Sequence, residues 1–483
     1  MSKTRKFLFA SFGQNYIGIA LQLISSVIIA RLLTPHEIGI FSVAMVLIGF
    51  AHTFRDSGST TYIIQEKELT PDRIRAAFAL TLATAWLLAA VIGLGSGYAA
   101  EFYREPGIRT VMLILSLNFI LLPFGSVPMA YMHRQMDSQR IALINIIPNV
   151  ISVITSIGMA YKGFGYLSMA WGSVSGTVCT IILVQLWRPT GLPFLPGFKE
   201  IKRVLSFGVL ANLMMILIDV SRGGPDLIIG RLSGVTTLSF FGRSMGLISM
   251  FEKLVMRALW SVALAHFSLQ SRNKGGMKDS FLESATLVTA VAWPFFINLG
   301  LLGRSVILVF YGNQWVDSIL PMQLLCLAAI LTSPFLLAGP MMTAIGQMKQ
   351  NLYQLFIRVP VLLVLVFFAA PYGLKVIASV FILSSLIDMV VGYLQCKIVL
   401  MINLKDMVRA LYKSAGVALI SAIFSLVLFL FGRDIPLWLQ LSLGAMGSAL
   451  GWGVALYLLK HPLRREIDQS FMMAKRTLAT LTR

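Results

Sequence analysis

Long apolar segments follow one another along the whole chain and are separated by short polar connections. Two examples are LVLVFFAA within residues 362–370 and ISAIFSLVLFLF at 420–431. Runs of about 20 apolar residues are long enough to cross the hydrocarbon core of a bilayer as helices. The pattern therefore predicts an all-α polytopic membrane protein. Its fourteen predicted spans are 11–32, 38–61, 76–99, 108–130, 141–160, 165–187, 205–231, 236–262, 284–310, 319–344, 351–371, 374–398, 411–431 and 436–459.

One stretch of this pattern occurs twice. IARLLTPHEIGIFSVAMVLIGF at 29–50 aligns without gaps with IGRLSGVTTLSFFGRSMGLISM at 229–250, so that Arg31 matches Arg231 and Phe41 matches Phe241. Six predicted spans separate the two copies, so both begin on the same side of the membrane, and internal repeats are common in transporters. We expect two six-helix lobes, residues 1–203 and 204–400, with the substrate between them. Residues 401–483 would add two further helices and a basic tail.

Composition supports this interpretation and explains the excess of positive charge. Hydrophobic residues make up 57% of the chain and charged residues 12%, whereas a soluble domain carries about 25% charged residues. If the N-terminus is cytoplasmic, about 26 of the 40 Lys and Arg residues lie on the cytoplasmic side and about 7 on the other side, as the positive-inside rule requires. We therefore expect both termini in the cytoplasm, and the net charge of +20 gives no reason to expect a nucleic-acid partner.

Charged residues inside the predicted spans are the main candidates for function. A lipid-facing charge near the bilayer centre costs roughly 2.5–3.5 kcal/mol, so most of these side chains must pair, reach an interface or face a wet cavity. The basic members are Arg55, Arg222, Arg243, Lys253, Arg257, Arg304 and Arg358, and the acidic members are Asp56, Asp219, Asp226, Glu252 and Asp388.

Helical spacing places three of these charges together in span seven. Asp219, Arg222 and Asp226 stand at i, i+3 and i+7 and so share one face of the helix. The neighbouring Gly-Gly-Pro at 223–225 is expected to interrupt that helix. Broken helices at membrane depth tend to border cavities, so a cavity is expected beside these charges.

Span eight carries a second group of charges. Arg243, Lys253 and Arg257 fall within an arc of about 80° if every residue turns by 100°. A cationic cavity would take an anionic substrate, because Arg binds phosphate oxygens through paired hydrogen bonds. Two other interpretations stay open: the acids and bases neutralise each other and hold the lobes together, or Lys253 and Arg257 extend to the interface.

The sequence gives no signal for enzymatic or metal chemistry. The spacings HExxH, GxSxG and CxxC and the P-loop do not occur, and the five histidines are far apart. The three cysteines lie in separate apolar segments, which predicts neither disulfides nor a metal site. No catalytic residue, metal ligand or cofactor is therefore expected.

Four segments resemble a known family, the bacterial polysaccharide repeat-unit flippases that translocate O-antigen and exopolysaccharide units. RDSGSTTYIIQEKELT at 55–70 is similar to the family pattern D-x-G-x-x-x-x-(I/L)-(I/V)-Q-x-K at the end of span two. IIARLLTPHEIGIFSVA at 28–44, DLIIGRLSGVTTLSFFGRSMGL at 226–247 and VFYGNQWVDSILPMQLLCL at 309–327 resemble three further family segments in the same order. Ser239 and Gly242 depart from the pattern before the second-lobe arginine.

The resemblance implies a function for the predicted cavity. Members of this family belong to the multidrug/oligosaccharidyl-lipid/polysaccharide exporter superfamily. They move undecaprenyl-diphosphate-linked oligosaccharide from the cytoplasmic to the periplasmic leaflet of the bacterial inner membrane by alternating access, for O-antigen, capsule or exopolysaccharide synthesis. The resemblance leaves open coupling to protons or sodium ions and association with the polymerase and chain-length proteins of the same pathway. The residues expected to line the substrate path are Arg55, Asp56, Asp219, Arg222, Asp226, Arg243, Lys253 and Arg257.

Two other functions remain as alternatives at this point. One is a drug or small-molecule exporter of the same superfamily, whose cavity should carry an excess of acidic residues. The other is an integral-membrane glycan polymerase, which would normally carry its catalytic residues on larger loops outside the membrane. Within span two we expect Arg55 to receive the diphosphate, with Asp56 setting its position.

Overall fold

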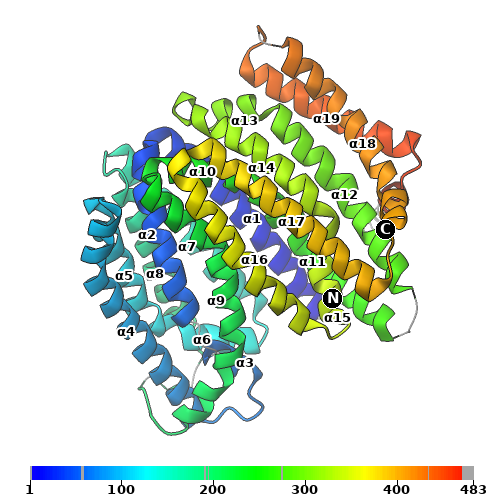
Figure 1. The fold of residues 1–483 in the computed structure, drawn as a ribbon. Coiled ribbons are helices and arrows are strands. Elements are labelled where there is room, and N and C mark those ends of the chain that lie inside the picture. The colour runs from blue at the N-terminus through cyan, green and yellow to red at the C-terminus, as the bar shows by residue number, and fades with distance from the viewer. Residues whose placement is uncertain are drawn as a thin grey trace, which may run out of the picture. The chain divides into compact units, whose positions relative to one another are not determined.

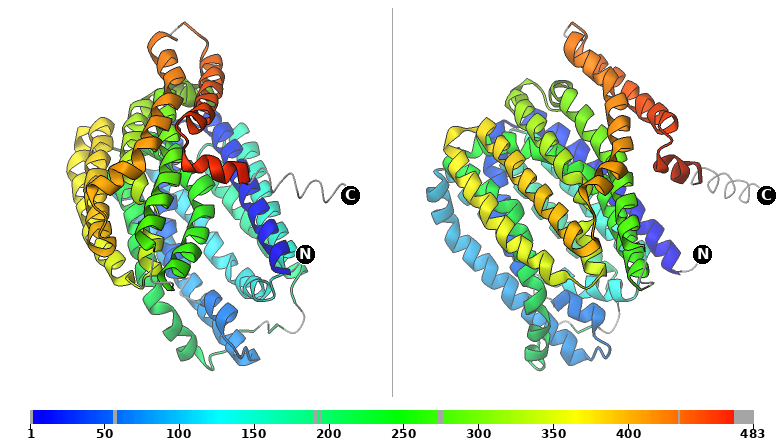
Figure 2. Two further views of the ribbon diagram at one scale, coloured as in Figure 1. Left: turned by 90° about the vertical axis from the view of Figure 1, so that its right-hand side faces the viewer. Right: turned by 45° about the vertical axis from the view of Figure 1, so that its right-hand side comes forward.

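The computed structural model describes residues 3–55, 59–189, 192–193, 195–272, 276–432 and 434–469 (Figures 1 and 2). Every regular element among these residues is a helix. Ten helices are long and apolar enough to cross a membrane, or eleven when a bent pair counts as one span. Each of the fourteen predicted spans coincides with one helix or with a run of consecutive helices. The prediction of a multi-pass all-α membrane protein is confirmed.

The first compact unit comprises residues 1–240 and 362–371. Within it α4 packs along α5, α7 packs along α8 and α1, and α2 packs against α5 and α9. Its helices are α1 Lys3–Leu32, α2 Pro35–Arg55, α3 Ser59–Gln65, α4 Pro71–Tyr103, α5 Pro106–Leu121, α6 Pro123–Arg134, α7 Ser138–Tyr161, α8 Leu167–Leu186 and α9 Ile201–Leu232.

The second compact unit comprises residues 241–361 and 372–483. Within it α12 packs along α14 and α18, α14 packs along α17, and α18 pairs with α19. Its helices are α10 Val235–Phe251, α11 Arg257–Arg272, α12 Met277–Leu301, α13 Gly303–Phe310, α14 Ile319–Thr332, α15 Ala338–Ala344, α16 Met348–Ala369, α17 Leu374–Leu400, α18 Leu404–Phe431 and α19 Leu437–Leu458. Helix α10 begins in the first unit, and the last turns of α16, from residue 362, belong to it. The division into lobes at residues 203 and 400 stays a prediction.

Proline marks the start or the bend of several helices in the first unit. Pro71 and Pro106 stand in the first turns of α4 and α5, where a missing backbone N–H costs no helical hydrogen bond. Thr70 caps α4 by accepting a hydrogen bond from the backbone N–H of Arg73 at 3.4 Å. Predicted span four is divided into α5 and α6, which meet at an angle of 51° where Pro123 begins α6.

Helix α9 corrects the prediction of an interrupted span seven. The helix runs without a break from Ile201 to Leu232 and includes Pro225 in its interior. Membrane helices tolerate an interior proline when neighbouring helices compensate for the lost backbone bond. Both glycines before Pro225 are in close contact with other helices, Gly223 with Val46 of α2 and Gly224 with Leu363 of α16. This packing supports a continuous helix where local sequence alone favours a break.

Predicted span eight is not one regular helix. Helix α10 ends at Phe251, a π-helical turn covers Glu252–Met256, and α11 begins at Arg257. A π-helical turn has i→i+5 hydrogen bonds and so fits an extra residue into the turn. The assumption of 100° per residue does not hold across it, so the shared arc of Arg243, Lys253 and Arg257 stays a prediction that regular helical geometry no longer supports.

The two copies of the repeated segment share their helix boundaries. Helices α1 and α9 end at Leu32 and Leu232, and α2 and α10 begin at Pro35 and Val235. The link between the helices therefore falls at the same place in both copies. The internal symmetry of complete lobes stays a prediction.

The C-terminal hairpin of α18 and α19 is bonded to α12 at several depths. Ser448 of α19 donates to Asn298 Oδ1 at 2.7 Å, and Ser425 of α18 lies 2.7 Å from Ser448. Trp452 of α19 donates to the carbonyl of Ala290 at 2.8 Å. Because lipid offers no hydrogen bonds, buried polar groups in a membrane must be satisfied by neighbouring helices. The hairpin is therefore an integral part of the second unit.

At the end of this hairpin, the His461 side chain is 1% exposed and joins three segments. Its Nε2 lies 3.1 Å from Ser414 Oγ, and its Nδ1 accepts from the backbone N–H of Leu463 at 3.1 Å. Ser414 in turn donates to the carbonyl of Thr286 at 3.1 Å. Since Nδ1 accepts, this network assigns the proton of a neutral imidazole to Nε2.

We predict that this histidine makes the protein less stable in acid. Burial, and then the charge of Lys413, lowers the pKa of His461 from 6.5 to about 4. The unfolded chain therefore binds a proton at His461 near pH 6.5, whereas the folded chain binds it only near pH 4. The contribution of the neutral side chain to the free energy of unfolding is thus complete above pH 6.5 and is lost as the pH falls toward 4. Thermal unfolding of the detergent-solubilised protein between pH 7.5 and 5 should show a steeper loss of stability for wild type than for His461→Gln. Equal pH slopes would contradict the prediction.

Candidate functional site

Helices α2 and α9 approach each other closely along their length. A Cβ atom on Gly223 would lie 2.8 Å from Val46 Cγ1, and one on Gly39 would lie 2.1 Å from the carbonyl oxygen of Val235, where α10 begins. Small residues at such positions let membrane helices pack backbone to backbone. The charges at the ends and along the faces of these two helices are therefore held at fixed positions.

The carboxylate of Asp219 is bound by a hydroxyl of α2. Thr53 Oγ1 donates to Asp219 Oδ2, and Thr53 lies two residues before the end of α2. Asp219 makes no ion pair with a described residue, although Arg222 stands only three residues further along α9. Arg222 is exposed and has no hydrogen bond or ion pair with any side chain that the structure describes. The acid and the base of this helix face therefore do not neutralise each other.

Arg55 is the last residue of α2 that the structure describes. It lies in the last turn of α2, where a cation interacts favourably with the helix dipole. Its guanidinium carbon lies 6.0 Å from the ring centroid of Phe119 on α5, and the His52 ring stacks on the same phenyl group with 4.6 Å between centroids. The prediction that span two continues to residue 61 stays a prediction, because α3 begins at Ser59 and the residues between it and Arg55 lie outside the described chain. Asp56 lies outside the described residues.

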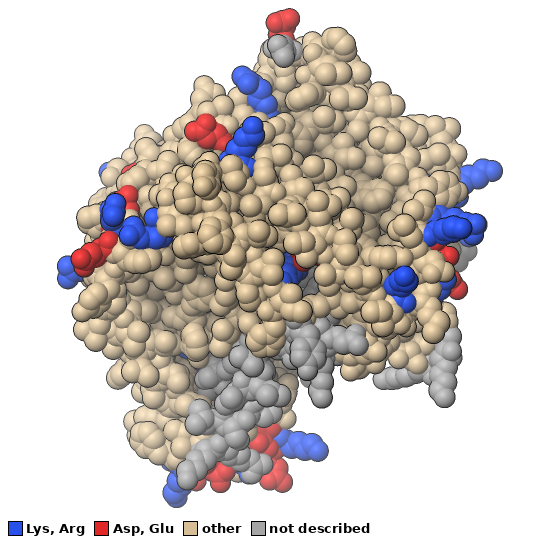
Figure 3. Space-filling model, in the orientation of Figure 1, with Lys and Arg blue, Asp and Glu red and all other residues tan. Residues whose placement is uncertain are grey.

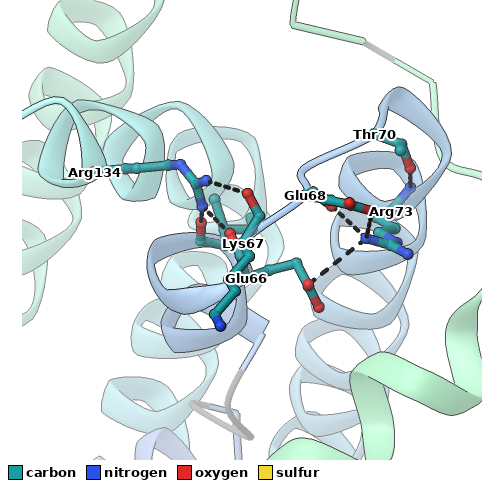
Figure 4. Close-up of polar contacts among 7 residues, drawn as sticks. Glu66, Lys67, Glu68, Thr70, Arg73 and Arg134 are labelled. Atoms are coloured by element: carbon teal, nitrogen blue, oxygen red, sulfur yellow. Dashed lines mark hydrogen bonds and ion pairs between the residues drawn. The ribbon is translucent and has the colours of Figure 1, made fainter.

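Two arginines hold the connection that follows α3 (Figure 4). Arg134, the last residue of α6, donates to the carbonyls of Ile63 at 2.9 Å, Glu66 at 2.5 Å and Lys67 at 3.3 Å. These carbonyls lie at the C-terminal end of α3, where backbone acceptors lack helical partners. We call Arg134 and these three carbonyls the α3 clamp.

On the other side of the same connection, Arg73 of α4 binds the acidic residues. Its Nη1 lies 3.6 Å from the carboxylate of Glu66 and 4.0 Å from that of Glu68, and it also donates to the Glu68 carbonyl. The segment QEKELT therefore has a structural role in this chain: it ties the end of α3 to α4 and α6. Tyr62 and Ile63 extend this anchorage into the core, where both are buried beside Ile74 and Val127.

In the second unit, Arg243 lies between two aromatic rings. Its guanidinium carbon is 4.5 Å from the ring centroids of both Tyr311 and Trp315. Trp315 is fully buried, and Ser244 Oγ donates to the carbonyl of Ser318 at 2.8 Å, so the segment after α13 is fastened to α10. Cation–π contacts of a desolvated Arg stabilise by about 2 kcal/mol or more. These contacts with aromatic rings explain how the apolar helix α10 accommodates the charge of Arg243.

The remaining charged candidates lie apart from these groups. Lys253 is exposed within the π-helical turn, and the side chain of Arg257 is outside the described residues. Asp226 is partly buried in α9. Arg358 of α16 forms an ion pair with Asp388 of α17 at 2.9 Å. On the face shown in Figure 3, charged side chains gather toward the edges and leave wide uncharged areas, as a lipid-facing surface requires.

Comparison with known proteins identifies the family. The family model for "Polysaccharide biosynthesis protein" matches residues 28–320. The chain belongs to this polysaccharide biosynthesis family. The lipopolysaccharide biosynthesis protein WzxC of Escherichia coli (strain K12) is 21% identical over 95% of this chain and 94% of its own length. The succinoglycan biosynthesis transport protein ExoT of Rhizobium meliloti (strain 1021) is 23% identical over 95% and 92%.

The fold of this polysaccharide biosynthesis protein also resembles a solved structure. The lipid II flippase MurJ, in an inward closed conformation, superposes with a TM-score of 0.72 at 13% identity, over 94% of this chain and 99% of that one. The similarity covers more of the chain than the family model does. The chain therefore shares its fold with that solved structure over most of its length.

Sequence reasoning about this family member missed three contributors to these sites. Thr53, Arg134 and Trp315 carry the contacts of Asp219, α3 and Arg243, and each comes from another helix or connection. Only Trp315 carried a signal, because it lies in the family-like segment YGNQW. No three His, Cys, Asp or Glu side chains gather to hold a metal ion within the part of the chain that the structure describes.

We predict that the α3 clamp needs the charged guanidinium of Arg134, whose N–H groups donate to three carbonyls at once. Arg134→Gln leaves acceptors at the end of α3 without their donor, and hydrogen bonds to charged groups are worth about 1.5–3 kcal/mol. Thermal stability in detergent should fall, and trypsin should cleave after Lys67 faster. Arg140→Gln is the matched control, because the ion pair of Arg140 with Asp137 is surface-exposed and weak. Identical cleavage rates for both variants would disprove the clamp.

Proposed function

We propose that this polysaccharide biosynthesis protein is a flippase for undecaprenyl-diphosphate-linked oligosaccharide repeat units. It resides in the bacterial inner membrane with both termini in the cytoplasm, and it moves the repeat unit from the cytoplasmic to the periplasmic leaflet. The family, a relative named as a transport protein and the fold shared with a lipid II flippase support this proposal. The excess of basic residues in the connections assigned to the cytoplasm supports the orientation.

One observation carries the assignment of the substrate's charge. Arg222 is an exposed guanidinium on a predicted membrane span, and the acid nearest to it in sequence on the same helix face is bound to Thr53 instead. A cation at membrane depth is costly unless it meets an anion or water. A diphosphate supplies oxygens that a guanidinium binds with two parallel hydrogen bonds. Arg222 is therefore the residue proposed to contact the diphosphate, with Arg55 at the end of α2 as a second cation on the path.

Arg243 receives a different role in this proposal. Its guanidinium contacts two aromatic rings, and the neighbouring Ser244 fastens the segment after α13. It supports the architecture of α10. Among the intramembrane bases that the structure describes, Arg243 and Arg358 are anchored by neighbouring side chains, whereas Arg222 and Arg304 are exposed. Of these two, Arg222 is the one proposed to contact substrate, because the acid beside it is held by α2.

The membrane potential favours outward movement of an anion. A charge gains about 2.3 kcal/mol per 100 mV, so two uncompensated diphosphate charges gain roughly 4–5 kcal/mol at 100 mV. An inside-negative membrane can therefore contribute to the driving force. Coupling to protons or sodium ions stays open.

The drug-exporter alternative is not favoured, because the family and the named relatives belong to polysaccharide biosynthesis. Two of the acids in the predicted spans are also occupied, since Asp388 is paired with Arg358 and Asp219 is bound by Thr53. A glycan polymerase is not favoured either, because the relatives and the solved neighbour quoted above include a named transport protein and a flippase.

The direct test uses purified protein in lipid vesicles with a fluorescent undecaprenyl-diphosphate oligosaccharide. Quenching of the label in the outer leaflet measures how much substrate has changed sides. Vesicles with protein should equilibrate the two leaflets much faster than empty vesicles. Equal rates, with correctly folded protein, would reject the flippase proposal.

We predict a specific requirement for Arg222 within that assay. Arg222→Gln should reduce flipping at least about tenfold, because one lost charge-assisted phosphate contact is worth on the order of 1.4 kcal/mol or more. Arg222→Lys should retain part of the rate, since Lys keeps the charge but not the paired geometry. The thermal midpoint should not change, because the side chain has no described hydrogen bond or ion pair to lose.

Two further variants serve as controls for this prediction. Arg304→Gln removes an equally exposed cation from α13, and it should leave the flipping rate near wild type. Arg243→Gln should lower the thermal midpoint along with the rate, because it breaks the contacts with Tyr311 and Trp315. Equal losses for Arg222→Gln and Arg304→Gln would show that total charge, not the position of Arg222, matters.

A further inference from the structure

Thr53 is a polar residue near the end of an apolar helix, and its hydroxyl has two acceptors within reach. It donates to Asp219 Oδ2 of α9, and the carbonyl of Gly49 in its own helix lies 3.4 Å away. A Thr hydroxyl in a helix usually bonds the carbonyl four residues earlier, and it needs no other partner. Here the hydroxyl also has a second acceptor, the carboxylate of Asp219 on the neighbouring helix.

The carboxylate has an alternative partner on its own helix. Asp219 and Arg222 are three residues apart on α9, and side chains at this spacing can form an ion pair. In the structure they do not pair, and Arg222 remains exposed without a described partner. Thr53 therefore competes with Arg222 for one carboxylate, and Thr53 holds it.

The packing of α2 against α9 makes this competition effective. Gly223 lies next to Val46 and Phe50 of α2, so the two helices are in close contact one turn away from Asp219. This packing fixes the position of α2 beside Asp219, and the short Thr53 side chain therefore holds its hydroxyl close to the carboxylate. Asp219 needs no large movement to choose between its two partners, because a rotation about its side-chain bonds is enough.

We propose that Thr53 is a positioning residue for substrate binding: by holding the Asp219 carboxylate on α2, it keeps Arg222 available to the phosphate groups of the lipid carrier. This inference rests on the proposed function, in which Arg222 contacts the diphosphate. Without the Thr53 hydroxyl, Asp219 turns toward Arg222 and forms an intrahelical ion pair. The substrate must then break that pair before it binds, so its affinity falls although neither charged residue has changed.

The test compares Thr53→Val and Thr53→Ser in two backgrounds, wild type and Asp219→Asn. Valine has nearly the shape of threonine and lacks the hydroxyl, whereas serine retains the hydroxyl. An asparagine at 219 carries no charge and cannot form the competing ion pair. Binding of farnesyl diphosphate to the purified full-length protein and the vesicle flipping rate are both measured, with thermal midpoints to verify folding.

We expect Thr53→Val to weaken farnesyl diphosphate binding about three- to tenfold, the size of one competing charge-assisted bond. Thr53→Ser should bind like wild type. In the Asp219→Asn background, whatever its own affinity, adding Thr53→Val should produce no further loss. This epistasis separates the proposal from a packing role, because a packing defect would appear in both backgrounds.

Two results would overturn the inference. One is unchanged binding in Thr53→Val, and the other is an equal loss from Thr53→Val in both backgrounds. Failure of the proposed function has a different signature: the wild-type protein would not flip the lipid-linked oligosaccharide at all, whatever the Thr53 variants do. The diphosphate-binding measurement therefore tests Thr53 independently of the flipping measurement.

Discussion

The hydrocarbon core of a membrane offers no hydrogen bonds, and this constraint explains most of the polar contacts in this protein. Each charge or amide that enters a span must find its partner in another helix. Arg243 contacts two aromatic rings, Arg358 forms an ion pair with a carboxylate, and Asn298 accepts a hydrogen bond from a hydroxyl of the C-terminal hairpin. Arg222 is informative against this background, because no described side chain compensates its charge.

The helical architecture could be predicted because it depends on properties that sequence displays directly. Apolar length predicted where the helices lie, ten or eleven of which are long and apolar enough among the described residues to cross a membrane, and the distribution of Lys and Arg gave an expected orientation. The failures occurred where a distant helix decides the outcome. Pro225 should break a helix by its local chemistry, yet packing at Gly223 and Gly224 keeps α9 continuous. The π-helical turn at Glu252–Met256 likewise has no local signature, and it invalidated a calculation based on regular helical geometry.

The candidate site could be predicted only in part, for the same reason. Helical spacing placed Asp219 and Arg222 on one face of span seven, and it left open whether they neutralise each other. Spacing within one helix says nothing about Thr53, which arrives from a span 166 residues earlier and takes the carboxylate. The family-like segments have a related limitation. QEKELT and YGNQW indicated membership, but their contacts with Arg73, Arg134 and Arg243 indicate that much of this signature serves to position helices.

The attachment of the C-terminal hairpin has a practical consequence for observing the transport cycle. Hydrogen bonds from α18 and α19 reach α12 at Thr286, Ala290 and Asn298, and a further bond joins Gln440 to Ser305 of α13. A body fastened at so many heights translates and rotates with α12 as one object. A fluorophore or spin label on the outer face of α19, for example at Met446, which is 63% exposed, is therefore a fixed reference mark for α12. Distances measured from it would report displacement of α12 without placing a probe near the path of the substrate.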